Sequence, residues 1–401
     1  MPPAMALRLD LRCQSDADLE ASLLKELEVR QAVEKLEKEG DLGARRQLLA
    51  TSVRVTQAMS PRLDALIRAC CTTLGVETPV ETYVYPDSSF NAGCVRPEQG
   101  RVFVMLSSAL LEAFDDEELR FVIGHELGHH LFAHHRLPVR LLAGEGGVPG
   151  PTAMTLFAWS RFAEVSADRA GFVCAGGLEP VARALFKLAS GLKGGLVQMR
   201  ADDLLAQVGD MREELSRQAS VEEKPRGDWF ATHPFSPLRL HAAKYFAQSA
   251  LFDGTGATKA ELEAQVADLM SLMAPSYLKE PGEVPELMRR LLLAGGVCVA
   301  AASGEVDAKE KAALEKFFGP GTCDRLNVKA LQGDLERRAG DVKAKVTPLK
   351  RQQVVRDLCV IALADGHAQD AERALLLRIA EWAGVEAALV QRTLAAAPTL
   401  D

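Results

Sequence analysis

The segment FVIGHELGHHLFAHH, residues 121–135, contains five of the eight histidines in a chain of 401 residues. At its centre lies an HExxH motif, residues 125–129. On a helix, residues four apart are about 6 Å apart along the axis and lie on nearly the same face. His125 and His129 can therefore bind one Zn²⁺, and Glu126 can reach a water on that metal as a general base. The alternative is a polar helix face whose histidines bind no metal.

The flanking sequence predicts the secondary structure around this motif. Asp115 is a suitable N-cap and Glu118 follows at capping-box spacing, so a helix is expected to begin there and to end near Pro138. Before it, ETYVYP (81–86) and RVFVML (101–106) are typical of strands, and the segment between them is rich in turn residues. The motif is therefore expected in the middle of a helix that follows a small sheet.

A catalytic zinc needs a third protein ligand from another element, and EVSADRAG (164–171) offers one. Glu164 and Asp168 are four apart on a predicted helix, among apolar residues. Glu164 can bind zinc, and Asp168 can accept the free ring N–H of a ligand histidine and so fix its tautomer. Alone, such a pair is usually two solvated charges.

HExxH followed by ExxxD resembles the HtpX-like and CAAX prenyl endopeptidase-type gluzincin zinc metallopeptidases. Two further pieces occur in the expected order, and the resemblance covers roughly residues 60–250. SSFNAGCVRPEQGRVFVMLSS, which begins at Ser88, resembles the turn and edge strand before the active-site helix, and THPFSPLRL (232–240) resembles a later Thr-His-Pro segment. Many members carry transmembrane helices around the protease core, whereas none is visible in this sequence.

The resemblance implies one zinc per chain, with His125, His129 and Glu164 as its ligands. It implies that Glu126 is the general base and later the proton donor, and that Asp168 supports a ligand. His233 would face the metal and either polarise the oxyanion or occupy the open zinc position; otherwise it is a turn residue before Pro234. Arg239 would pair with Asp168 or a nearby carboxylate. Strand 102–106 would bind the substrate backbone. His130, His134 and His135 are expected to be structural or solvated.

An internal repeat occupies residues 286–398, in which Gly304 aligns with Gly366 at an offset of 62 residues. Each unit contains an apolar helix, an acidic turn and an amphipathic helix. The repeat resembles the TerB-like (tellurite-resistance) helical domain, whose acidic turns can bind a metal. That resemblance makes four residues candidates for a second divalent cation site: Asp307, Glu310, Asp365 and Glu372. The alternative is that these acids cap helix N-termini.

These patterns predict an α+β, predominantly helical protein. Residues 1–60 are expected to form an N-terminal helical segment. Residues 61–275 are expected to form a zinc metallopeptidase domain, with a zincin-type core that contains a small β-sheet and the active-site helix. Residues 286–401 are expected to form an all-α TerB-like domain of two repeated helix-turn-helix units, which senses a signal or binds a protein partner.

The predicted function is a soluble, cytoplasmic zinc metalloendopeptidase that hydrolyses polypeptides by attack of a zinc-bound water activated by Glu126. The net charge of −8 and the lack of a basic patch argue against nucleic acid as a partner. The sequence shows no signal peptide or transmembrane segment, while peripheral membrane contact stays open. The alternative is a latent or non-catalytic zinc-binding protein that acts in a stress response through its TerB-like domain. A third interpretation is a tellurite or metal-stress factor whose protease core is only a scaffold.

Overall fold

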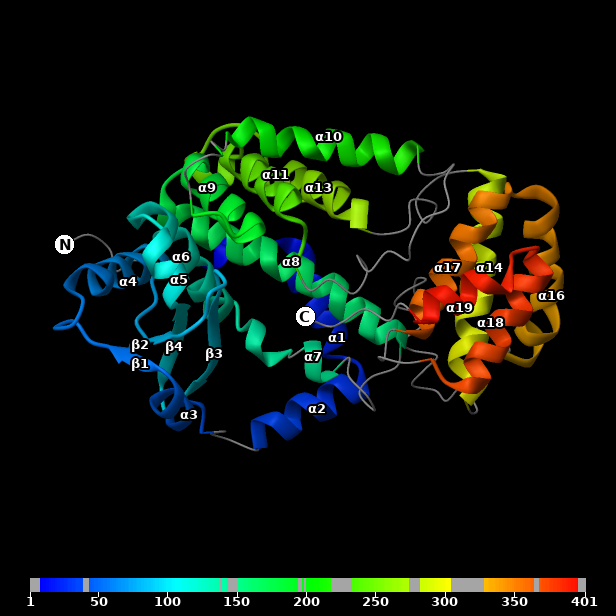
Figure 1. Cartoon of the computed structure of the whole chain (residues 1–401), viewed down its shortest axis with the longest axis horizontal. Coiled ribbons are helices and arrows are strands. Elements are labelled where there is room, and N and C mark those ends of the chain that lie inside the picture. The colour runs from blue at the N-terminus through cyan, green and yellow to red at the C-terminus, as the bar shows by residue number, and fades with distance from the viewer. Residues whose placement is uncertain are drawn as a thin grey trace.

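A computed structural model of the chain describes residues 8–38, 43–137, 139–142, 150–193, 197, 200–217, 233–273, 282–303, 328–363 and 368–395. Most of these residues are helical, and one small mixed sheet lies in the N-terminal half. This architecture confirms the predicted α+β, predominantly helical class. Figure 1 shows the sheet at one end of the molecule, the C-terminal helices grouped at the other, and α8 (Gly150–Ala175) extending between them.

The sheet has the strand order β1-β2-β4-β3. Its strands are β1 (Val53–Val55), β2 (Val80–Tyr85), β3 (Ala92–Glu98) and β4 (Arg101–Ser107). β2 and β4 are parallel, and β1 and β3 pair antiparallel with β2 and β4, respectively. β2 and β4 match the two predicted strands. β1 lies inside the segment expected to be helical, and β3 lies inside the segment expected to consist of turns.

The position of β4 overturns one expectation about substrate binding. Strand 102–106 was expected to bind the substrate backbone, but β4 pairs with β2 on one side and with β3 on the other. A strand that is paired on both sides has no free backbone groups for a further strand. Among the described strands, β3 is the one at this edge of the sheet, and it lies against α6 (Asp116–Leu131).

Helix α6 carries the HExxH motif and begins at the predicted place. Asp115 accepts hydrogen bonds from the backbone N–H groups of Glu117 and Glu118, and Glu118 accepts one from the backbone N–H of Asp115. This reciprocal capping box satisfies amide groups that the first helical turn cannot pair. The predicted end near Pro138 is wrong, because α6 ends at Leu131 and Ala133 adopts a left-handed φ of 57°.

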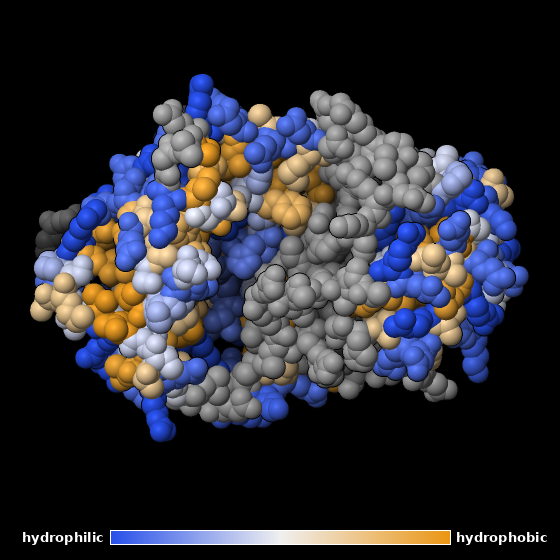
Figure 2. All heavy atoms as spheres, in the orientation of Figure 1, coloured by the Kyte–Doolittle hydropathy of each residue, from blue (hydrophilic) through white to orange (hydrophobic). Residues whose placement is uncertain are grey.

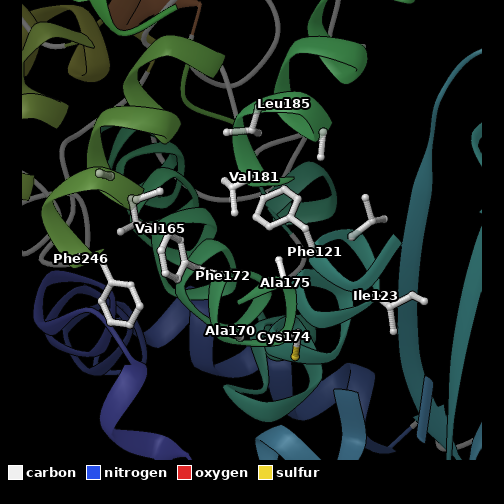
Figure 3. Close-up of a cluster of buried hydrophobic side chains, with 14 of the residues drawn as sticks. Phe121, Ile123, Val165, Ala170, Phe172, Cys174, Ala175, Val181, Leu185 and Phe246 are labelled. Atoms are coloured by element: carbon white, nitrogen blue, oxygen red, sulfur yellow. The ribbon is translucent and has the colours of Figure 1, made fainter. Parts of the chain in front are cut away.

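α6 packs closely against α8 through small residues on both helices. A Cβ atom on Gly128 would lie 2.8 Å from Ala170 Cβ, and one on Gly171 would lie 2.6 Å from the Phe121 carbonyl oxygen. Figure 3 shows the apolar side chains around this contact, among them Phe121, Phe172 and Cys174. Such close approach lets side chains of the two helices meet at one point between them.

We expect Gly171→Ala to destabilise the protein by about 1–3 kcal/mol, because the added methyl group would force α6 and α8 apart. The measurement is the midpoint of urea unfolding. Gly209→Ala in α10 (Ala201–Arg217) is the control, since a Cβ there meets nothing within 4 Å. The free energy of unfolding of that variant should equal that of wild type or exceed it by up to about 1 kcal/mol. Equal midpoints for Gly171→Ala and wild type would contradict the close helix contact.

The other described elements up to residue 273 surround this helix pair and the sheet (Figure 1). They are η1 (Leu9–Leu11), α1 (Gln14–Leu23), α2 (Leu27–Lys38), α3 (Ala44–Thr51), α4 (Pro61–Leu74), α5 (Ser108–Ala113), η2 (His134–Arg136), α7 (Val139–Leu142), α9 (Leu178–Ser190), α11 (Ser236–Ala247), α12 (Ala250–Asp253), α13 (Lys259–Met270) and η5 (Ser271–Met273).

The described C-terminal elements are all helical: α14 (Glu283–Ala300), η7 (Ala301–Ser303), α16 (Val328–Lys345), α17 (Pro348–Ala362), α18 (Asp370–Ala383) and α19 (Ala387–Ala395). α14 and α17 occupy equivalent positions in the internal repeat, and they pack against each other. The second helix of the first repeat unit would lie outside the described residues. The boundaries 1–60, 61–275 and 286–401 stay predictions.

One hydrophobic cluster connects the two halves of the molecule. It includes Val29 and Val33 of α2, Phe157 of α8, and Met288 and Leu291 of α14, all of them buried. No helix among the described residues has the length and apolar character needed to cross a bilayer. On the face seen in Figure 2, hydrophobic residues are visible in patches between hydrophilic ones over both halves.

Candidate metal centre

Three side chains that the sequence singled out meet between α6 and α8. His125, His129 and Glu164 each offer one ligand atom, and these atoms all lie within 4.8 Å of one another. The Nε2 atoms of the two histidines are 3.1 Å apart. Glu164 Oε2 lies 3.4 Å from His125 Nε2, and Glu164 Oε1 lies 3.3 Å from His129 Nε2. The two helices thus bring two imidazoles and a carboxylate to one point.

The chemistry of this cluster fits a divalent cation. Glu164 Oε2 is buried and has no hydrogen-bond partner within the described part of the chain. Burial disfavours a protonated His125, but the Glu164 and Asp168 carboxylates outweigh burial and raise its pKa to about 10. The cluster therefore favours positive charge. Two imidazole nitrogens and one carboxylate oxygen are a protein ligand set typical of catalytic zinc sites, in which the fourth position is taken by water or substrate.

Asp168 and Arg239 form an ion pair behind His125. Asp168 Oδ1 lies 3.0 Å from His125 Nδ1, and the Arg239 guanidinium on α11 donates to both Asp168 oxygens at 2.9 and 2.6 Å. Burial alone would raise the pKa of Asp168, but Arg239 and His125 hold it below its ordinary value. An ionised carboxylate can only accept hydrogen bonds, so a neutral His125 carries its proton on Nδ1, where it donates to Asp168. The lone pair of His125 Nε2 then faces the cluster.

Glu126 and His233, the two predicted catalytic residues, come from different parts of the chain. Glu126 is 8% exposed on α6. Burial, and to a smaller degree the Glu126 carboxylate, raise the pKa of the Cys94 thiol on β3. His233 precedes α11, and its Nε2 atom lies 3.4 Å from Glu164 Oε1 while 60% of the side chain is exposed. His233 is therefore at the solvent side of the cluster.

His134 contacts the cluster, although the sequence predicted only a structural or solvated role for it. Its Nδ1 atom lies 2.8 Å from His129 Nδ1, and the residue is 6% exposed. Burial lowers the pKa of His134 to about 4, more than the nearby Asp16 carboxylate raises it. His134 is five positions after His129, a spacing that puts the two residues on different faces of a continuous helix. The left-handed Ala133 breaks the helix and returns His134 to His129.

Most residues of the predicted second cation site lie outside the part of the chain that the structure describes. Asp307, Glu310 and Asp365 lie outside the described residues. Glu372 is 7% exposed and accepts a hydrogen bond from the backbone N–H of Gln369 at 2.8 Å, as part of the capping box of α18. This capping role is the alternative that the sequence left open. The second site stays a prediction.

Comparisons with known protein families match both the part of the chain that contains this cluster and the C-terminal part. Residues 57–149 and 139–247 match the family model of Peptidase family M48, and residues 289–395 match that of tellurite resistance protein TerB. The chain carries an M48 peptidase domain and a TerB domain. The M48 match includes all three residues of the cluster, and a metallopeptidase family implies a metal.

A curated protein to which this chain is similar is the plastoglobule-localized metallopeptidase 48, chloroplastic, of Arabidopsis thaliana. It is 29% identical over 170 residues, which cover 40% of this chain and 49% of that protein. The chain therefore spans about half the length of this relative. No solved structure matches the chain significantly.

Proposed function

We propose that this protein is a zinc metalloendopeptidase that hydrolyses peptide bonds in polypeptide substrates. The observation that supports this most strongly is the convergence of His125, His129 and Glu164 within an M48 domain. These residues would hold one Zn²⁺ per chain. Location in the cytoplasm and a protein partner for the TerB domain stay predictions.

Each neighbouring residue has a proposed role. When bound, Zn²⁺ lowers the pKa of water and polarises the scissile carbonyl. Glu126 would accept a proton from the attacking water and then donate it to the leaving amine. His233, at the solvent side beside Glu164, would donate a hydrogen bond to the oxygen on which charge develops. Asp168 and Arg239 would hold His125 in the tautomer that leaves Nε2 free.

A substrate strand would bind along β3. Of the described strands, β3 is the edge strand beside α6, and Gly93 and Cys94 pair with Met105 and Val104 of β4 on its inner side only. A substrate that adds to this edge would use backbone hydrogen bonds, which do not depend on side-chain identity. Selectivity would then depend on pockets for individual side chains.

The second candidate function is a latent or non-catalytic zinc protein. It is favoured by the position of His233, because an imidazole 3.4 Å from Glu164 Oε1 could also serve as a fourth metal ligand. The two functions differ in whether the zinc-loaded protein cleaves polypeptides.

The test is casein cleavage by the purified full chain. We expect a chelator to abolish cleavage, because the metal is lost, and stoichiometric Zn²⁺ to restore it. Mg²⁺ is the control, since a site of two imidazoles and one carboxylate suits zinc better than a hard cation. Cleavage that persists after chelation would contradict a metal-dependent mechanism. Zinc-loaded protein without cleavage would favour the latent protein.

A further inference from the structure

Asp16 of α1 is a fully buried carboxylate far from the HExxH motif in sequence, yet close to it in space. Its exposed fraction is 0%, and five donors surround its two oxygens. Arg12 donates from Nε and Nη2 at 2.9 Å, Trp159 Nε1 donates at 2.9 Å, and Ser166 Oγ donates at 2.7 Å. His134 Nε2 completes the set at 3.0 Å. A buried charge is costly without such partners, and this one is fully surrounded by donors.

The contacts of Asp16 continue through His134 to His129. Because an ionised carboxylate can only accept, a neutral His134 carries its proton on Nε2 and presents a bare Nδ1. That Nδ1 lies 2.8 Å from His129 Nδ1, a distance at which one nitrogen must donate and the other accept. His129 then carries its proton on Nδ1, and its Nε2 lone pair faces Glu164 and His125.

We propose that Asp16 and His134 position His129 as a metal ligand, by fixing its tautomer and ring orientation through two consecutive hydrogen bonds. The inference rests on the proposed function and extends it. His125 and His129 would then be supported separately, by Asp168 with Arg239 and by Asp16 through His134. Both residues are positioning residues, since neither is among the three that meet at the metal centre.

This inference makes the N-terminal segment part of the metal site. Asp16 precedes the part of the chain that matches the M48 family, which begins at residue 57. Further buried contacts hold the N-terminal segment in place: the Cys13 backbone N–H donates to Ser166 Oγ of α8 at 3.0 Å, and the Cys13 thiol donates at 3.0 Å to Glu263 of α13. Glu263 also pairs with Arg169 of α8 at 2.8 Å. The M48-matched segment alone would therefore lack the support for His129.

The experiment measures the zinc dissociation constant of full-length variants by competition with a chromophoric chelator. We expect His134→Phe and Asp16→Asn to weaken zinc binding about 10–100-fold, the usual effect of removing support from a metal ligand. His134→Asn should lose less affinity than His134→Phe, because its amide oxygen can still accept from His129 Nδ1. The thermal midpoint of each metal-free variant is measured alongside.

Glu263→Gln is the matched control. It weakens the buried ion pair that anchors the same N-terminal segment, yet it does not contact Asp16 or the histidines. It should lower the thermal midpoint and keep the zinc dissociation constant within about twofold of wild type.

Two outcomes would overturn the inference. One is zinc affinity in His134→Phe and Asp16→Asn equal to that of wild type, which would leave the proposed function intact. The other is a loss of affinity in Glu263→Gln as large as in those variants, which would reveal general destabilisation. If His134→Phe does not fold, the zinc dissociation constant of Asp16→Asn alone tests the inference. Wild type that binds no zinc would instead refute the proposed function.

Discussion

Glu126→Gln should abolish peptide hydrolysis and leave zinc bound. The amide has nearly the shape of the carboxylate, so α6 and the three proposed ligands keep their positions. An amide cannot take a proton from water, and positioned general bases contribute about 10²–10⁴-fold to rate. We therefore expect casein cleavage to fall by at least about 10²-fold. Zinc content, measured by elemental analysis, should equal that of wild type.

Glu117→Gln provides a control on the same helix. Glu117 lies in the first turn of α6, where its exposed side chain pairs with Arg183 at 3.0 Å, far along the helix from the motif. This variant should cleave casein like wild type. Glu126→Gln that retains full activity would rule out Glu126 as the base, and Glu126→Gln that loses zinc would show that this residue contributes to metal binding.

Glu164→Ala should remove the metal and, with it, all cleavage. Glu164 is the one ligand candidate from α8, and its Oε2 atom is buried without a hydrogen-bond partner among the described residues. Without that carboxylate, two imidazoles must hold the ion alone, and the charge that favours a cation in the cluster is lost. The purified variant should contain far less than one zinc per chain, and added zinc should not restore cleavage.

Glu98→Ala is the matched control for the loss of a buried glutamate. Glu98 is 5% exposed on β3 and accepts a hydrogen bond from the backbone N–H of Ala44 at 3.0 Å. The Glu98→Ala variant removes a comparable buried carboxylate that is not part of the metal cluster. Its zinc content should therefore equal that of wild type. Stoichiometric zinc in Glu164→Ala would show that another residue is the third ligand.

Much of the candidate site could be predicted because local spacing determines it. Residues four apart on a helix must share a face, which brings His125 to His129 and Glu164 to Asp168 whatever the surroundings. The capping residues Asp115 and Glu118 likewise fix where α6 begins. The pairing of these two helices came from resemblance to a family, since no pattern within the chain shows that α6 packs on α8.

The features that the sequence did not reveal depend on tertiary structure. β3 contains Gly93 and Pro97 and is only partly buried, so it lacks the alternating pattern of a strand. The reversal at Ala133 needs a left-handed residue, and alanine gives no signal for one. The approach of Asp16 to His134 joins residues 118 apart in sequence, a contact that only the packing of α1 on α8 creates.

The most direct test of the zinc peptidase proposal is the zinc content of purified wild-type protein, determined by elemental analysis beside casein cleavage with and without chelator. The proposal predicts one zinc per chain and cleavage that disappears when the chelator removes it. Protein that contains no zinc, even after reconstitution with the metal, would contradict the proposal. The cluster of His125, His129 and Glu164 would then need another explanation.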